Sequence, residues 1–367
     1  MKNIIKIVLR KQKMTTIKTA IVGVGNNTSS LIQGIEFYKK NNKKSNSVLG
    51  ILHPNIGKYD IKDIEFVAAF DINKEKVGKD LSEAIFSKPN CMSRFCKVPY
   101  LGVDVYKGPI FDGLGCNLMN IVPVDEKQQQ VNVAKILREA DSEILINFLP
   151  TGSKKATEFY AEEALKANCG FINSIPELIA SSLKWEEKFS HAGLPLSGDD
   201  IKSQIGGTIL HRALVNLFVK RGVKIEETCQ LNSAGNADFL NLSDEVRYKS
   251  KLITKKTAIQ SQIPYDTNIC MPTPDYVEHS EDNRICHITL KGKYFGETPV
   301  SVDVKLSIED SPSAAGAMVD VIRIMRLAID REISGVLHEI CPFYFKHPPI
   351  QCDDNLAYEK VKKFIEF

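Results

Sequence analysis

Short apolar runs and stretches of helical spacing alternate along the first half of the chain. Residues 19–25 form an apolar run that enters a glycine turn, and residues 29–40 carry apolar side chains at helical spacing. A second apolar run ends at Asp71, after a polar insertion over residues 41–62. The pattern continues with a helix over residues 131–140, a strand over 144–148, a helix over 154–167 and a strand over 170–173. This alternation predicts an α/β fold with a doubly wound parallel sheet.

After residue 200 the pattern changes. A helix through Arg221 precedes a strand over residues 226–232, and a polar region then extends to about residue 282. Two strands of alternating character follow over residues 285–294 and 299–308, and a long helix runs from about 313 to 331. The second half therefore predicts a smaller α+β domain with a mixed or antiparallel sheet, inserted between elements of the first.

Composition and charge exclude several classes of protein. The 367 residues are 43% hydrophobic and 25% charged, with a net charge of +3, so no basic nucleic-acid surface is indicated. No apolar run approaches the roughly 20 residues that cross a bilayer. Nine scattered cysteines without a Cys-x-x-Cys pair favour reduced thiols in a cytoplasmic protein and give no sign of a metal site. We expect residues 1–16 to be a flexible extension, with Met14 as an alternative start to Met1.

The first glycine turn is a candidate dinucleotide site. Its sequence matches only part of the Gly-x-Gly-x-x-Gly pattern, because Thr28 occupies the third glycine position. The context is stronger: a strand precedes the turn, a helix follows it, and Asp71 ends the next strand, where a carboxylate favours NAD over NADP. Glycine used merely for a tight turn is the alternative. The cofactor residues expected here are Gly23, Gly25, Asn26, Asn27 and Asp71.

Residues 197–212 form a polar entrance to a helix. Asp199 and Asp200 are expected to cap the amides of the following helix, while Ser203 and the two glycines after it allow close backbone approach to a ligand. This arrangement predicts a binding site. His211 and Arg212, further along, are expected on the helix surface or at an interface.

Two lysines, Lys251 and Lys255, are spaced to share one face of a helix. Converging on an anionic substrate, they would hold a phosphate and stabilise a developing oxyanion. Solvated surface lysines are the alternative. Lys346 lies in an aromatic and proline-rich setting that would fix its direction, and residues 232–238 combine amides, glycine and a carboxylate in ligand-binding or turn chemistry.

Taken together, these motifs resemble those of the myo-inositol-1-phosphate synthase (inositol-3-phosphate synthase) family, from about Ile17 to the C-terminal region. The segments that carry the resemblance are residues 22–26 and 29–34, 66–71, 198–204, 230–232, 235–236 and 238–241, Ser250, Lys251 and Lys255, and 309–312.

The resemblance implies a fold and a reaction. It implies an NAD-binding Rossmann-like domain over residues 17–200 and about 311–367, with a catalytic and oligomerisation domain over 201–310, usually in a homotetramer. It implies conversion of D-glucose 6-phosphate to 1L-myo-inositol 1-phosphate (1D-myo-inositol 3-phosphate) in inositol and phospholipid biosynthesis. The steps are oxidation at C5, loss of a C6 proton, aldol closure of C6 onto C1 and return of the hydride.

The resemblance also assigns residues, and which lysine moves which proton stays open, as does any need for a divalent metal or ammonium. Lys251 is the first choice for proton transfer at the C5 oxygen, Lys255 for phosphate or oxyanion stabilisation, and Asp200 for orienting Lys251, with Lys346 also beside the substrate. Substrate contacts are implied at Ser203, Asn232, Asn236 and Lys255. NAD contacts are implied at Asp80, Ala140, Tyr160, Ser203, Asp238 and Lys251.

One catalytic position departs from the family. Arg284 stands where a further lysine is expected, and arginine clamps phosphate well but does not readily deliver a proton. If this position only balances charge, activity survives; a one-residue slip of the alignment would also explain it. Two other functions remain: an NAD-dependent sugar-phosphate dehydrogenase, and a non-catalytic NAD- or phosphate-binding protein.

Overall fold

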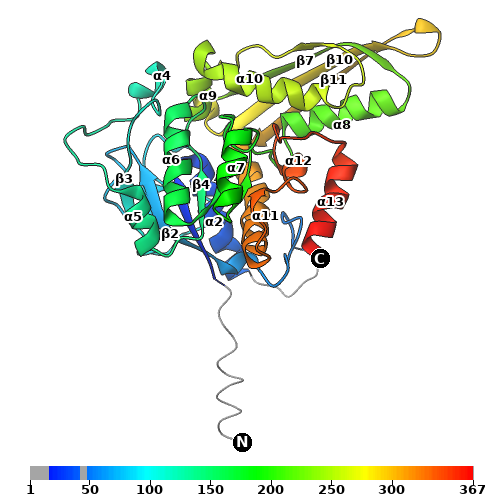
Figure 1. Ribbon diagram of the computed structural model, residues 1–367. Coiled ribbons are helices and arrows are strands. Elements are labelled where there is room, and N and C mark those ends of the chain that lie inside the picture. The colour runs from blue at the N-terminus through cyan, green and yellow to red at the C-terminus, as the bar shows by residue number, and fades with distance from the viewer. Residues whose placement is uncertain (1–15, 42–47, 367) are drawn as a thin grey trace, which may run out of the picture.

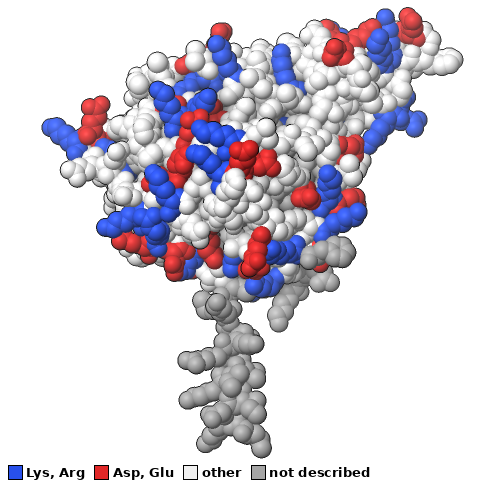
Figure 2. Space-filling view, viewed as in Figure 1, with Lys and Arg blue, Asp and Glu red and all other residues white. Residues whose placement is uncertain are grey.

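Two β-sheets, each with its own helices, organise the protein (Figure 1). The computed structural model describes residues 16–41 and 48–366. The extension predicted over residues 1–16 therefore lies outside the described residues, apart from Thr16. Within the described part of the chain, no helix is both long and apolar enough to span a membrane. Basic and acidic side chains are interspersed on the face shown in Figure 2.

The first sheet has seven parallel strands in the order β12-β6-β5-β4-β1-β2-β3. They are β1 (Ile17–Val22), β2 (Ile64–Asp71), β3 (Val105–Lys107), β4 (Ile144–Asn147), β5 (Gly170–Asn173), β6 (Pro195–Ser197) and β12 (Gly335–Val336). The predicted doubly wound α/β fold is confirmed. Strand order reverses between β1 and β4, and ligands of such sheets bind outside the carboxyl ends of the strands at this point.

Helices cover this sheet and bury apolar strands on both faces. Every residue of β4 and β5 is buried, as expected for central parallel strands. Helix α11 packs against α2 and against β1, β4 and β6, and α5 packs against α6. The helices of this part are α2 (Asn26–Lys40), α3 (Leu81–Ala84), α4 (Cys116–Met119), α5 (Val133–Glu139), α6 (Lys154–Ala167), α7 (Leu183–His191), α11 (Asp310–Asp330), α12 (Cys341–Tyr344) and α13 (Asp354–Glu366), with a 3₁₀ turn, η1 (Ile61–Asp63).

The second sheet is mixed, as the alternating pattern predicts. Its order is β11-β10-β7-β8, with β9 beside β7; β10 runs antiparallel to both neighbours, whereas β8 and β9 run parallel to β7. Helices α8 and α10 contribute Val215, Phe218 and Ile259 to a cluster with Ile288 and Leu290 of β10. The elements are α8 (Gly207–Lys220), β7 (Lys224–Ala234), α9 (Ala237–Leu242), α10 (Glu245–Gln260), β8 (Asn268–Cys270), β9 (Asp275–Tyr276), η2 (Glu278–Ser280), β10 (Asn283–Lys293), η3 (Phe295–Glu297) and β11 (Pro299–Glu309).

The chain leaves the first sheet after β6 and rejoins it with α11 and β12. The second sheet is therefore inserted in sequence between elements of the first. The exact limits of residues 17–200, 201–310 and 311–367 remain a prediction.

The region before residue 282 holds more structure than its polar composition indicates. Helix α10 buries Arg247, Thr254 and Lys255, which are polar side chains. Its apolar periodicity is therefore weak, because the buried face of this helix is directed partly at other polar groups rather than at a core.

His211 and Arg212 are fully buried, so their predicted place on the helix surface is wrong. His211 pairs with Thr228 and Gln230 of β7, at 2.7 and 3.2 Å. Arg212 Nε and Nη2 donate to both carboxylate oxygens of Asp354, at the start of α13. The two side chains tie α8 to a strand and to the C-terminal helix, and satisfying their polar groups is what allows burial.

Candidate active site

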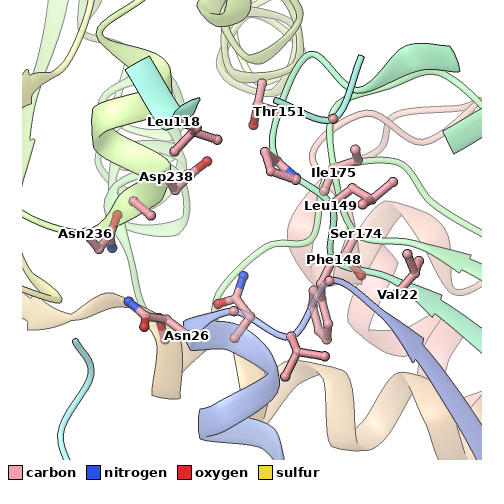
Figure 3. A pocket seen from close by; sticks show the side chains of 18 of the residues that line it. Val22, Asn26, Leu118, Phe148, Leu149, Thr151, Ser174, Ile175, Asn236 and Asp238 are labelled. Carbon is pink, nitrogen blue, oxygen red and sulfur yellow. The ribbon is translucent and has the colours of Figure 1, made fainter. Parts of the chain in front are cut away.

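A pocket lies where the carboxyl ends of the first sheet meet α9 and α10. Figure 3 shows Phe148 and Ser174, which follow β4 and β5, on one side and Asn236 and Asp238, at the start of α9, on the other. One side of the pocket therefore comes from loops at the carboxyl ends of the first sheet, and the other from the start of α9. Predicted site residues that line this pocket are Gly23, Gly25, Asn26, Asn27, Asp71, Tyr160, Ser203, Asn236, Asp238, Lys251, Lys255, Arg284 and Lys346.

At the glycine turn, Gly23 packs closely against the backbone of Phe148, and Gly25 leaves open space at the start of α2. Gly23 has a φ of +89°, and a Cβ there would lie 2.5 Å from the Phe148 carbonyl oxygen. A Cβ on Gly25 would meet nothing within 4 Å. Gly25 caps α2 without a side-chain hydrogen bond, and no acidic residue lies in the first turn. The amides at the start of α2 therefore suit a pyrophosphate, so the turn fits a dinucleotide.

Thr28 replaces the third glycine of the pattern without opening the turn. Its side chain is fully buried, and its Oγ1 donates a 2.6 Å hydrogen bond to the Gly23 carbonyl. The hydroxyl thus closes the turn with a hydrogen bond from within the helix, which explains why the incomplete motif still forms the loop.

Asp71 lies beside the turn, at the end of β2. Its Oδ2 accepts from the Val24 amide at 2.8 Å, and its Oδ1 accepts from the amides of Ile72 and Asn73. Lys76 lines the same end of the pocket and donates to the Val24 carbonyl at 2.7 Å. Burial lowers the pKa of Lys76, although Asp71 opposes this effect. Charged side chains from two positions therefore hold Val24, between the two glycines.

Asp200 is the centre of a cationic cluster on the other wall. Its side chain is fully buried; its Oδ1 lies 2.7 Å from Lys346 Nζ and 3.2 Å from Lys251 Nζ, and Thr254 Oγ1 donates to its Oδ2. Burial alone would raise the pKa of Asp200, but Lys251 and Lys346 outweigh it and hold the pKa well below its usual range. The backbone amide of Lys346 also donates to the Asp200 carbonyl at 2.7 Å, which fixes the loop that carries Asp200.

The three lysines of this cluster differ in pKa. Burial lowers the pKa of Lys255 to about 7, and its nearest charged neighbours are cations that act in the same direction. Burial also lowers the pKa of Lys346, to about 8, against the pull of Asp200. Burial would lower the pKa of Lys251 too, but Asp200 and Asp238 raise it above its ordinary value. Lys255 is therefore the lysine closest to releasing its proton at neutral pH.

Arg284 is fixed by two partners. Its Nη1 donates to Asp310 Oδ1 at 3.0 Å, and its Nη2 donates to Asn232 Oδ1 at 2.7 Å. Its Nε is buried without a partner in the described part of the protein. Asn232 does not itself line the pocket and reaches it through Arg284. A second unpartnered atom in the pocket, Ser174 Oγ, leaves another hydrogen-bonding group available to a ligand.

Two residues expected to contact NAD lie away from the pocket. Asp80 caps α3: its carboxylate accepts from the amides of Ser82, Leu101 and Val103. Ala140 follows α5 and ends that helix, with its amide bonded to the Ile136 carbonyl. Neither residue lines the pocket.

The prediction that Asp199 and Asp200 cap the following helix is wrong. Helix α8 begins at Gly207, and its N-cap, Gly206, offers no side-chain hydrogen bond. Asp199 instead accepts from the amides of residues 179–181 and from Asn173 Nδ2. Asp200 instead faces Lys251 and Lys346. This segment therefore contributes to the site by its charge and not by capping the helix.

Comparisons with known proteins agree on one family. A family model described as myo-inositol-1-phosphate synthase matches residues 206–311. The inositol-3-phosphate synthase of Corynebacterium glutamicum is 42% identical over 96% of this chain and 98% of its own length. That of Mycolicibacterium smegmatis is 40% identical over 95% and 98%.

Solved structures have the same fold. The crystal structure of Ari2 is 33% identical, with a TM-score of 0.77, over 96% of this chain and all of that one (100%). A myo-inositol-1-phosphate synthase-related protein from Thermotoga maritima, 23% identical, has a TM-score of 0.81 over 96% of this chain and 99% of its own.

Proposed function

Since the chain belongs to the inositol-3-phosphate synthase family, we propose that it isomerises D-glucose 6-phosphate to 1L-myo-inositol 1-phosphate. Oxidation at C5 makes the C6 protons acidic, loss of one gives an enolate, the enolate carbon attacks the C1 aldehyde, and reduction at C5 restores the hydroxyl. Substrate and product have the same atoms and oxidation state, so cofactor is needed only in catalytic amount.

The observation that carries this proposal is one pocket with two different walls. The glycine turn and the free start of α2 form a dinucleotide wall, and the lysines around Asp200 form an anionic-substrate wall. NAD, when bound, supplies reversible hydride transfer. Gly23, Gly25 and the α2 amides would hold its pyrophosphate, and Asp71 would face its ribose.

The pKa shifts favour roles for Lys251 and Lys255 that differ from those implied by the resemblance. Lys255, whose pKa is lowered to about 7, suits proton removal from the C5 hydroxyl and its return. Lys251, kept charged by Asp200, suits stabilisation of the enolate oxygen. Lys346 shares the same carboxylate and adds a further positive charge to the pocket.

Arg284 is a permanent positive charge in this scheme. Its guanidinium is held between Asp310 and Asn232, and arginine stays protonated. It therefore balances the charge of the sugar phosphate while Lys255 moves the proton. Asn236 and Ser203 complete the substrate wall.

A homotetramer, a cytoplasmic location and a role in inositol and phospholipid biosynthesis belong to the same proposal. The broad sheet of the inserted segment is the surface offered for assembly, and free rather than disulfide-bonded cysteines suit a reducing compartment.

Incubation of the purified protein with glucose 6-phosphate and a small amount of NAD tests the function. We expect an inositol monophosphate, identified by phosphorus NMR and chromatography, in large excess over the cofactor. Reduced cofactor formed one-for-one with substrate, without inositol phosphate, would instead identify a sugar-phosphate dehydrogenase. Binding of both ligands without product would identify a non-catalytic protein.

A further inference from the structure

A buried carboxylate, Asp282, joins three segments that line the pocket without lining it itself. Only 2% of Asp282 is exposed. Its Oδ1 accepts from Asn26 Nδ2 at 3.1 Å and from Asn236 Nδ2 at 2.9 Å. Ser311 donates to it twice, through its amide and its hydroxyl, both at 2.9 Å. One carboxylate therefore holds the starts of α2, α9 and α11 together.

The two asparagines belong to segments with different proposed ligands. Asn26 is the first residue of α2, directly after the glycine turn of the cofactor wall. Asn236 caps α9 through its Oδ1, which accepts from the Phe239 amide at 3.1 Å, and belongs to the substrate wall. Figure 3 shows them on the same side of the cavity, the one from α2 below the other. Both amide groups have a single carboxylate oxygen in common.

We propose that Asp282 is a positioning residue that couples cofactor binding to binding of the substrate's phosphate, through Asn26 and Asn236. This inference rests on the proposed function for the identity of the two ligands. Both asparagines are already hydrogen-bonded to Asp282, so a ligand that shifts either one shifts the carboxylate and, with it, the other asparagine. The two sites therefore influence each other's affinity through one shared group.

Burial of the Asp282 carboxylate costs free energy, so a gain in stability does not by itself explain its position. Burial raises the pKa of Asp282 to about 6, and the carboxylate of Asp310 adds to the effect. Around it, Cys91 is an uncharged thiol on the loop that bonds Asn26, and the Arg284 guanidinium on β10 is directed at Asp310 and Asn232. Among the described residues the carboxylate has no ion-pair partner of its own, and the four hydrogen bonds that it accepts favour its charged form.

Asp282→Asn tests the proposal without any need for turnover. The affinity for NAD is measured by calorimetry with no phosphate and with saturating inorganic phosphate. In the wild type we expect phosphate to tighten NAD binding by about fivefold or more, and in Asp282→Asn the ratio falls to about 1 while each ligand alone binds more weakly. A wild-type ratio of 1, or a variant that keeps the wild-type ratio, overturns the coupling.

Asp320→Asn is the matched control. Asp320 is 1% exposed and lies on α11, the helix that begins beside Asp282, but accepts from Tyr344 and Arg323 away from the pocket. We expect this variant to unfold at a lower temperature and to keep the wild-type affinity ratio. Loss of the ratio in Asp320→Asn too would show that any buried carboxylate has this effect, and would overturn the proposal.

If Asp282→Asn does not fold, the two asparagines provide the test. Asn236→Ser keeps a capping oxygen for α9 but is too short to reach Asp282, and Asn26→Ser shortens the other contact. We expect their effects on NAD affinity in the presence of phosphate to be non-additive by about threefold or more. Additive effects overturn the coupling. None of these measurements uses glucose 6-phosphate conversion, so failure of the proposed function would be seen separately, as absence of product.

Discussion

The two walls of the pocket use different chemistry for the same task of holding phosphate. On the first wall, backbone amides at the start of α2 face the cavity and glycine leaves room for a ligand. On the second wall, ammonium groups converge on the buried carboxylate of Asp200. Backbone amides do not titrate in the working range of pH, whereas Lys255 and Lys346, with pKa values of about 7 and about 8, do. Binding is therefore concentrated on the first wall and proton transfer on the second.

The largest expected effect is on turnover at the second wall. Lys255→Ala should lower kcat by roughly 10³-fold, because the lysine nearest to proton exchange is lost. The affinity for NAD, measured by calorimetry, should change little. Lys256→Ala is the matched control, since Lys256 is an exposed neighbour on the same helix. Wild-type kcat in Lys255→Ala would contradict the assignment.

Removing the charge partner should have the next largest effect. Asp200→Asn leaves Lys251 and Lys346 without their common carboxylate, so we expect kcat to fall by about 10²-fold and the pKa of both lysines to fall. The measurement is kcat against pH, in which the alkaline limb should move to lower pH, because both lysines act in their charged form. An unchanged profile would show that Asp200 does not set these charges.

A pair of glycine variants separates folding from binding on the first wall. Gly25→Ala places a methyl group in open space and should weaken NAD binding by about tenfold with an unchanged unfolding temperature. Gly23→Ala forces a Cβ against the Phe148 carbonyl at positive φ and should lower the unfolding temperature. Equal NAD affinity in Gly25→Ala and the wild type would mean that the ligand does not approach there.

A smaller effect is expected on stability. Replacing Lys255 should lower activity but raise the unfolding temperature. The pKa of Lys255 is about 7 when folded and is near its ordinary 10.5 when unfolded, so between these values the unfolded chain binds the extra proton. This group therefore makes the fold more stable as pH rises from about 7 to 10.5, and less stable as pH falls. Lys255→Met should raise the unfolding temperature at pH 7 and flatten its rise with pH, as followed by circular dichroism. A lower unfolding temperature would contradict the cost of burying this charge.

Arg284→Lys should have the smallest effect. A lysine keeps the positive charge beside Asp310, so we expect kcat within about threefold of the wild type, with a modest rise in KM for the sugar phosphate from loss of the contact to Asn232. A large gain in kcat would instead show that arginine had limited proton transfer at this position.

Local patterns predicted the first wall better than the second. The strands and helices near the glycine turn follow from periodicity, and α6 and β5 begin and end at the predicted residues. Lys251 and Lys255 could be paired by spacing, but the partner that separates their charge states, Asp200, is 51 residues before Lys251. Asp199 and Asp200 look alike in sequence. Only their tertiary contacts distinguish them, because Asp199 accepts hydrogen bonds from neutral amides and Asp200 pairs with ammonium groups.

Residues whose role depends on distant neighbours were missed or misplaced. Asp282 carries no motif, because its partners come from separate elements. His211 and Arg212 were expected outside, since a polar residue on a short helix is usually solvated. The burial of Arg212 depends on Asp354, 142 residues later, which no local pattern indicates.

The bond between Arg212 and Asp354 has a consequence for synthesis of the chain. Arg212 leaves the ribosome long before Asp354, and until then its buried place beside α10 lacks the carboxylate that compensates it. The packing of α8 against α13 through this ion pair can therefore form only after residue 354 has been synthesised. A chain ended just before residue 354 would carry this defect permanently.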